Sequence, residues 1–164
     1  MTTHYFPDAD ELELRPFTRA FVRLMFAHAA FERRISDLLT VITGVPGFGE
    51  RSGNRWPSNQ RVKRMKKLIK EHHPAGLAHT TELLAFLDSS VRLSHDRNLL
   101  AHGTWWELDA DVGTIAVRAG TDWPQEDQHR TFTIADIDAT AISLDNLEVE
   151  LWKIQRAIAN SLGR

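Results

Sequence analysis

The residues best suited to chemistry lie together in one short stretch, residues 96–103, with the sequence DRNLLAHG. Arginine is permanently charged and matches the geometry of phosphate with two parallel hydrogen bonds. Histidine accepts or donates a proton near neutral pH. An arginine and a histidine that act together are suited to phosphodiester cleavage, and Asn98 adds a polar amide beside them. Arg97, Asn98 and His102 are therefore the candidate catalytic residues.

The string Arg97-x-x-x-x-His102, with Asn98 after the arginine and Ala101 and Gly103 beside the histidine, resembles the signature of HEPN domains. The resemblance implies a small helical bundle and the activity of a metal-independent ribonuclease from a toxin or phage-defence system. It also implies a homodimer, because members of this family generally build their RNA-cleaving cleft where two copies meet. Specific residues match only from 97 to 103.

The same residues allow a second interpretation, in which Arg97 pairs with a local carboxylate and His102 only caps the end of its helix. The chain would then be a non-catalytic module for dimerisation and for binding RNA or protein. HEPN toxins that pair with an antitoxin usually carry a tyrosine two residues after the histidine, whereas Thr104 stands there in this chain. An antitoxin or regulatory protein therefore stays a possible partner on weaker grounds.

Helix geometry constrains how these residues cooperate. Five residues of an ideal helix place Arg97 and His102 about 140° apart around its axis, whereas Asn98 and His95 share the side of His102. Either the last turn before Gly103 is loosened, or one protomer's arginine approaches the other's histidine. The partial negative charge at the helix end favours the protonated imidazolium, which suits a general acid.

The composition indicates one ordinary globular domain spanning residues 1–164. We expect a cytoplasmic protein, because no run is long and apolar enough to cross a membrane and the first residues do not resemble a signal peptide. The absence of cysteine excludes disulfides and thiolate zinc sites. We expect neither a cofactor nor a metal ion. His72, His73 and His79 match no zinc-binding spacing that we recognise.

Charge is distributed unevenly along the chain. Residues 51–73 hold eight lysines or arginines against one acid, whereas residues 104–151 hold eleven acids against two arginines. The helix predicted over 59–72, with Ser58 as its N-cap, could bind an RNA backbone through its basic side chains or could simply be a solvated face. Its candidate RNA-binding residues are Arg61, Lys63, Arg64, Lys66, Lys67 and Lys70. Trp56, in the preceding loop, could stack on a base or pack against the bundle.

The periodicity predicts a mainly α fold, a four- to five-helix up-down bundle with a small β-hairpin inserted before the last helix. An irregular leader covers residues 1–13, and the first helix runs from Pro16 to Thr43, where Gly44 ends it. A loop follows over residues 44–58. The third helix extends from Pro74 or Ala75 to His102. The insertion covers residues 104–133 and contains a hairpin, which a third short strand around 131–133 could join.

Two further patterns complete the prediction. The last helix begins with Thr133 as its cap, paired with Asp136 in a variant of the capping box. In the first helix, His28 interrupts an apolar stripe, with Glu32 one turn later as its expected polar partner. His28 is either a hydrogen-bonded core residue or a side chain that approaches the Arg97 and His102 site. His95, His28 and Glu32 are thus supporting candidates for that site. Trp105 and Trp106 are both expected to pack.

Overall fold

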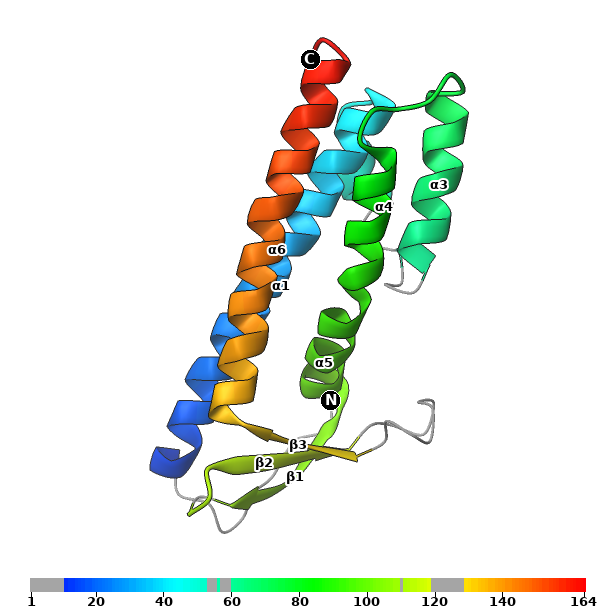
Figure 1. The fold of residues 1–164 in the computed structure, drawn as a ribbon. Helices are drawn as coiled ribbons and strands as arrows, with labels where there is room; N and C mark the ends of the chain where they lie inside the picture. The colour runs from blue at the N-terminus through cyan, green and yellow to red at the C-terminus, as the bar shows by residue number, and fades with distance from the viewer. Residues whose placement is uncertain (1–10, 53–55, 57–59, 110, 119–128) are drawn as a thin grey trace. The chain divides into compact units, whose positions relative to one another are not determined.

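The structure is a computed structural model that describes residues 11–52, 56, 60–109, 111–118 and 129–164. It is mainly helical with a small antiparallel sheet, which confirms the predicted class at this coarse level. In chain order the elements are α1 (Glu11–Thr43), α2 (Phe48–Ser52), α3 (Arg61–His72), α4 (Thr80–Ser89), α5 (Val91–His102), β1 (Thr104–Asp109), β2 (Thr114–Arg118), β3 (His129–Thr133) and α6 (Ile134–Ser161) (Figure 1).

Contacts within the chain form two compact units. Unit 1 consists of the described residues of 1–27 and 95–143, and unit 2 of those of 28–94 and 144–164. Helices α1, α5 and α6 contribute residues to both units. Each unit has its own set of buried apolar side chains, and each is described by itself below.

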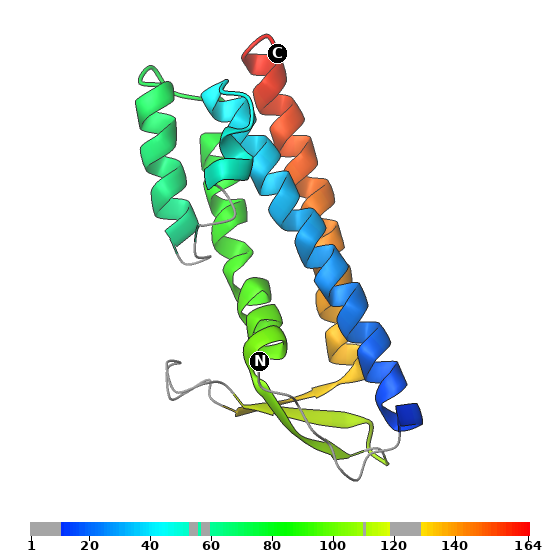
Figure 2. The same ribbon diagram turned by 180° about the vertical axis from the view of Figure 1, so that it is seen from behind.

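Unit 1 is built on the three-stranded sheet, in which β2 lies between β1 and β3 (Figure 2). Both pairs are antiparallel, and a bulge interrupts the β1–β2 register between Trp105 and Glu107. The predicted hairpin and the third strand are therefore both present. Alternating residues of β2, Ile115 and Val117, are buried, as is Phe132 of β3, which fits a sheet with one covered face. The apolar core of unit 1 comprises Phe17, Ala20, Leu24, Ala27, Leu99, Leu100, Ile115, Val117, Phe132, Ile137 and Ala141.

Unit 2 is entirely helical among its described residues. Helix α3 lies beside α4, and Phe31 of α1 packs its ring against Phe86 of α4 with centroids 6.3 Å apart. The guanidinium of Arg34 donates to Glu148 at 2.7 Å, which links α1 to α6. The buried apolar residues of unit 2 are Phe31, Ile35, Leu38, Leu39, Ile42, Met65, Leu68, Ile69, Leu77, Leu83, Leu87, Leu144, Leu151, Ile154 and Ile158.

Helix α1 starts earlier than predicted. It begins at Glu11, so Pro16 lies inside the helix rather than at its first turn, and residues 11–13 do not belong to an irregular leader. A proline there lacks the amide hydrogen that would bond to the carbonyl of Leu12, so α1 lacks one backbone hydrogen bond at this turn. The predicted apolar stripe and the end at Thr43 are confirmed. Residues 1–10 of the predicted leader lie outside the described residues.

The predicted third helix is two helices. Helix α4 starts at Thr80, after His79 in a left-handed conformation, and ends at Ser89, whereas α5 starts at Val91. The hydroxyls of Ser89 and Ser90 donate to carbonyls of the preceding turn, at 2.7 and 2.8 Å. Serine side chains that compete for backbone carbonyls in this way disturb a helix. The prediction was wrong because apolar periodicity does not register this competition.

Two boundaries around the predicted loop also differ. The short helix α2 lies inside the predicted loop 44–58, and its Gly49 lies so close to α1 that a Cβ there would be 1.6 Å from the carbonyl oxygen of Ser36. Helix α3 starts at Arg61 rather than Asn59, with Gln60 before it. The predicted cap Ser58 lies outside the described residues. The predicted end of α3 at His72 is confirmed.

Helix α6 begins with the predicted capping box. The hydroxyl of Thr133 accepts the amide of Asp136 at 3.0 Å, and the carboxylate of Asp136 accepts both the amide and the hydroxyl of Thr133 at 2.8 Å. None of the helices in the described part of the chain has the length and apolar character needed to cross a bilayer.

Candidate active site and basic surfaces

The C-terminal half of α5, in unit 1, is held to the sheet by two polar contacts. The indole of Trp105 in β1 donates to the carbonyl of Leu100 at 2.8 Å, and its ring packs edge-on against Phe21 of α1. Asp96 is buried and forms an ion pair with Arg130 of β3. These contacts fix the backbone that carries Arg97, Asn98 and His102. The packing predicted for Trp105 is confirmed, whereas the side chain of Trp106 lies outside the described residues.

Gly103 is needed for close packing rather than for a left-handed turn. A Cβ at this position would lie 2.4 Å from the carbonyl oxygen of Leu99 and 2.5 Å from the side chain of Val117 in β2. No side chain can occupy that space without moving the backbone. Helix α5 therefore passes directly into β1, with His102 as its last residue.

The last turn of α5 is a regular helical turn. The amide of Gly103 donates to the carbonyl of Leu99 at 2.8 Å, the four-residue spacing of an α-helix. The loosened turn that would have brought Arg97 toward His102 is therefore absent. Arg97 is half-buried and donates to the side-chain oxygen of Asn98 at 2.8 Å, whereas His102 is exposed. Among the described residues, no hydrogen bond or ion pair engages the His102 ring.

The supporting candidates fall in different units. His95 is half-buried in unit 1, about two turns before His102 on α5. His28 and Glu32 belong to unit 2, with 3.3 Å between the ring nitrogen of His28 and the carboxylate of Glu32, as predicted. His28 belongs to unit 2, whereas Arg97 and His102 belong to unit 1. That His28 lies near these two residues therefore stays a prediction.

Glu32 also forms an ion pair with Arg61, which corrects one predicted RNA-binding residue. Arg61 is only 4% exposed, and two of its three guanidinium nitrogens, Nε and Nη1, have no hydrogen-bond partner among the described residues. Its side chain points into unit 2 because it is the first residue of α3 and lies on the same face as Met65 and Leu68. A phosphate on the surface cannot reach it.

The remaining basic residues of α3 are exposed, as predicted: Lys63, Arg64, Lys66, Lys67 and Lys70. Arg64 lies over the ring of Trp56, 5.9 Å from its centroid, and Trp56 is half-buried. Lys67 lies 3.7 Å from Glu71, an exposed pair that constrains neither side chain strongly. The face is thus a row of solvated cations with one aromatic ring at its start.

Two histidines between α3 and α4, His73 and His79, have structural partners. The ring of His73 lies 2.6 Å from the carbonyl oxygen of Ile42, and that of His79 lies 3.1 Å from Glu82. In the ranges that the structure describes, no group of three or more His, Asp or Glu side chains is arranged to hold a metal ion.

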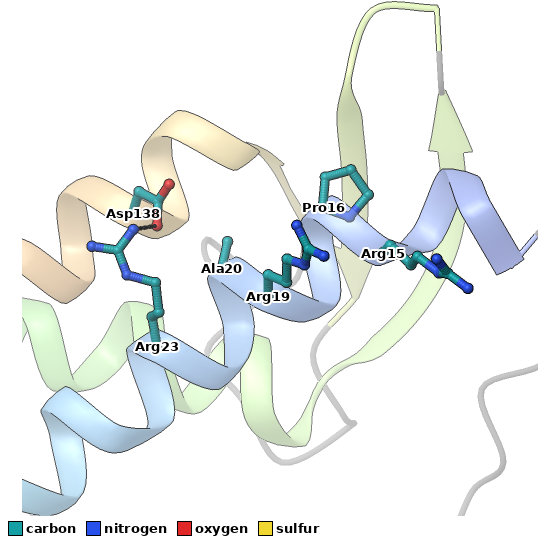
Figure 3. Close-up of a pocket in the computed structure, with 6 residues that line it drawn as sticks. All are labelled: Arg15, Pro16, Arg19, Ala20, Arg23 and Asp138. Atoms are coloured by element: carbon teal, nitrogen blue, oxygen red, sulfur yellow. Dashed lines mark hydrogen bonds and ion pairs between the residues drawn. The ribbon is translucent and has the colours of Figure 1, made fainter.

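Sequence reasoning missed a second basic surface, on α1 in unit 1. A pocket of about 420 Å³ is lined by Arg15, Pro16, Arg19, Ala20, Arg23 and Asp138 (Figure 3). The three arginines recur every four residues and so project from one face of the helix. That spacing was present in the sequence and could have indicated the surface. The carboxylate of Asp138 in α6 accepts a hydrogen bond from Arg23 at 2.9 Å. This contact could not be predicted from the sequence.

No protein-family model, curated protein or solved structure matches the chain.

Proposed function

We propose that this chain is a metal-independent RNA endonuclease of the HEPN type, in which Arg97 and His102 act on one phosphate and the nucleophile is the substrate's own 2′-hydroxyl. The observation that carries the proposal is the exposed His102 imidazole at the end of an anchored helix, in the same unit as the Arg97–Asn98 pair. A toxin or defence role is part of the same proposal and rests on the resemblance alone.

The proposed reaction needs one cation and one proton carrier. The 2′-oxygen attacks the adjacent phosphorus and gives its proton to a water molecule while the bond from phosphorus to the 5′-oxygen breaks. Arg97 would stabilise the charge that develops on the non-bridging oxygens, and His102 would protonate the leaving 5′-oxygen. Asn98, already bonded to Arg97, would hold the guanidinium in position. The products are a 2′,3′-cyclic phosphate and a 5′-hydroxyl.

A cleft shared by two copies fits the local geometry better than a site within one chain. Because the last turn of α5 is regular, Arg97 and His102 stay about 140° apart on their own helix. Exposed apolar side chains on α6 favour self-association: Ile142 in unit 1 is 50% exposed, and Val149 in unit 2 is 47% exposed. Such residues are common in helix-to-helix contacts between subunits.

The proposal is tested by incubating RNA with the protein in the presence of EDTA. Cleavage should persist, and Arg97→Ala and His102→Ala should each lower its rate by at least about 100-fold, the size expected for loss of acid catalysis or of charge stabilisation. Matched controls are Arg92→Ala, an exposed arginine of the same helix, and His72→Ala, an exposed histidine in the last turn of α3. Both controls should retain activity. Cleavage that requires a metal ion, or that survives both active-site substitutions, would remove this mechanism.

The alternative function is a non-catalytic module that dimerises and binds RNA or a protein. The regular last turn of α5, which keeps Arg97 and His102 about 140° apart around one helix, favours it. In that case the protein would bind RNA without cleaving it, and the cyclic phosphate product would be absent at every protein concentration.

A further inference from the structure

The pocket of unit 1 is lined by arginines that lie together on one face of α1. Arg15, Arg19 and Arg23 stand on successive turns of α1, about 6 Å apart along the helix axis. Ala20 is buried beneath them, and Asp138 closes one side. The hollow is open enough to admit part of a ligand and carries three guanidinium groups against one carboxylate.

Only one of the three arginines is neutralised within the described residues. Arg23 donates to Asp138 at 2.9 Å, with side chains 60% and 33% exposed. Arg15 and Arg19 are exposed, and neither has a hydrogen bond or an ion pair with the described part of the chain. Asp138 thus orients one guanidinium and leaves two free for an anion. Arginines of this kind bind phosphate oxygens in pairs of hydrogen bonds.

An exposed aromatic ring extends the same face. Phe26 follows Arg23 by three residues, which places it on the next turn, and it is 74% exposed, the most exposed large apolar side chain in the described chain. A basic groove beside an exposed aromatic ring is the combination with which proteins hold single-stranded nucleic acid, because cations bind the backbone and bases stack on the ring. A free phosphate ion or an acidic peptide carries no base to stack on the ring.

We propose that the Arg15, Arg19, Arg23 and Phe26 face of α1 binds single-stranded RNA, with Arg15 and Arg19 on successive phosphates and Phe26 stacked on a base. The choice of RNA as the nucleic acid rests on the proposed nuclease function. The face would hold the strand that the nuclease cleaves.

The test measures binding without cleavage. A fluorescein-labelled 2′-fluoro strand lacks the 2′-hydroxyl, so the proposed reaction cannot consume it, and its anisotropy reports affinity between about 0.05 and 0.3 M salt. Arg15→Gln with Arg19→Gln should weaken binding roughly tenfold and make the plot of log affinity against log salt shallower by about 1.4, the value for two phosphate contacts of a single strand. Phe26→Ala should weaken binding about tenfold and leave that slope unchanged.

The matched control is Arg33→Gln with Arg92→Gln, which removes the same charge from two exposed arginines in unit 2. Urea unfolding checks that every variant is folded. If the Arg15 and Arg19 variant binds like this control, or if Phe26→Ala has no effect, the proposed face is wrong. Cleavage of ordinary RNA is assayed separately. Binding that depends on this face without any cleavage would refute the nuclease proposal and leave the RNA face standing.

Discussion

At the scale of single residues, Asp136 is the side chain whose ionisation the fold controls most clearly. The amide and the hydroxyl of Thr133 both donate to its carboxylate, and these two hydrogen bonds, with a smaller contribution from Arg130, lower the pKa of Asp136. The charged form is favoured because the hydrogen bonds exist only while the oxygens are acceptors. The negative charge also lies at the positive end of the α6 dipole.

This gives a prediction on pH and stability. A folded pKa below the unfolded value of about 3.9 means that the stabilisation is complete above that value and is lost as the pH falls through the folded pKa. Asp136→Asn should therefore flatten the loss of stability below about pH 4, and Thr133→Ala should cost about 1 kcal/mol at neutral pH as a lost N-cap. Urea unfolding from about pH 2.5 to 7 measures both effects.

Asp145→Asn is the control for that series, because Asp145 is exposed on the same helix and takes part in no contact with the described residues. Its pH profile should match that of the unmodified protein. An Asp136→Asn profile that also matched would show that the cap is not the source of the acid sensitivity.

Sequence reasoning worked well at this scale where the interaction is local. The Thr133 and Asp136 cap and the Glu32 partner of His28 were both predicted, because each lies within one helical turn. It worked poorly where the partner is distant in sequence. The ion pair between Asp96 and Arg130 spans 34 positions, so the buried state of Asp96, next to the candidate arginine, has no local signal.

At the scale of elements, the network of His28, Glu32 and Arg61 fastens the start of α3 to α1 in unit 2. Removing one member of a buried ion pair leaves an uncompensated charge, which commonly costs 3–5 kcal/mol. We expect Glu32→Gln to lower the free energy of unfolding by about 3 kcal/mol, since Arg61 is almost fully buried and already has unpaired nitrogens. Urea unfolding at neutral pH measures this loss.

The exposed pair of Lys67 and Glu71 provides the control on the same helix. Glu71→Gln should change the stability by less than about 0.5 kcal/mol, because an exposed pair is screened by water. The double change Glu32→Leu and Arg61→Met should recover much of the loss, since both charges are then removed together. A Glu32→Gln protein as stable as the Glu71→Gln protein would contradict the role of this network.

The network also shows that the sequence predicted secondary structure better than contacts between helices. Helices α1, α3 and α6 and the hairpin followed from apolar periodicity, whereas α2 and the break between α4 and α5 did not. The direction in which Arg61 points did not follow, because a basic residue next to a basic run is assigned to the solvated side unless a carboxylate 29 positions away is known to meet it. On α1 the spacing of the three arginines was visible in the sequence, but the part that Asp138 plays in the pocket was not, since it lies 115 positions from Arg23.

At the scale of the whole molecule, the proposed shared cleft makes a prediction that only a dimer can satisfy. In a symmetric dimer, each site would take Arg97 from one protomer and His102 from its partner. Mixing inactive Arg97→Ala with inactive His102→Ala protein should restore about a quarter of the activity, because about half of the dimers are mixed and each has one intact site. Rates of RNA cleavage before and after subunit exchange measure this recovery.

A variant that no longer self-associates is the control for that experiment. Ile142→Glu with Val149→Glu should weaken self-association, seen by light scattering, and should remove the recovered activity with it. Activity of protein with Arg97 and His102 intact that survived dissociation would place the site within a single chain. A complete absence of recovery between variants that do form mixed dimers would equally exclude the shared cleft.

The close approach at Gly103 restricts how the molecule can vary. Even a methyl group at position 103 would collide with the carbonyl of Leu99 and with Val117. The distance between the end of α5 and β2 therefore depends on a glycine at this position. A homologue with alanine at this position would need its sheet displaced from the helix end. Its histidine would then lie at a different height above the strands, and under the proposed function it would meet the phosphate from a different position.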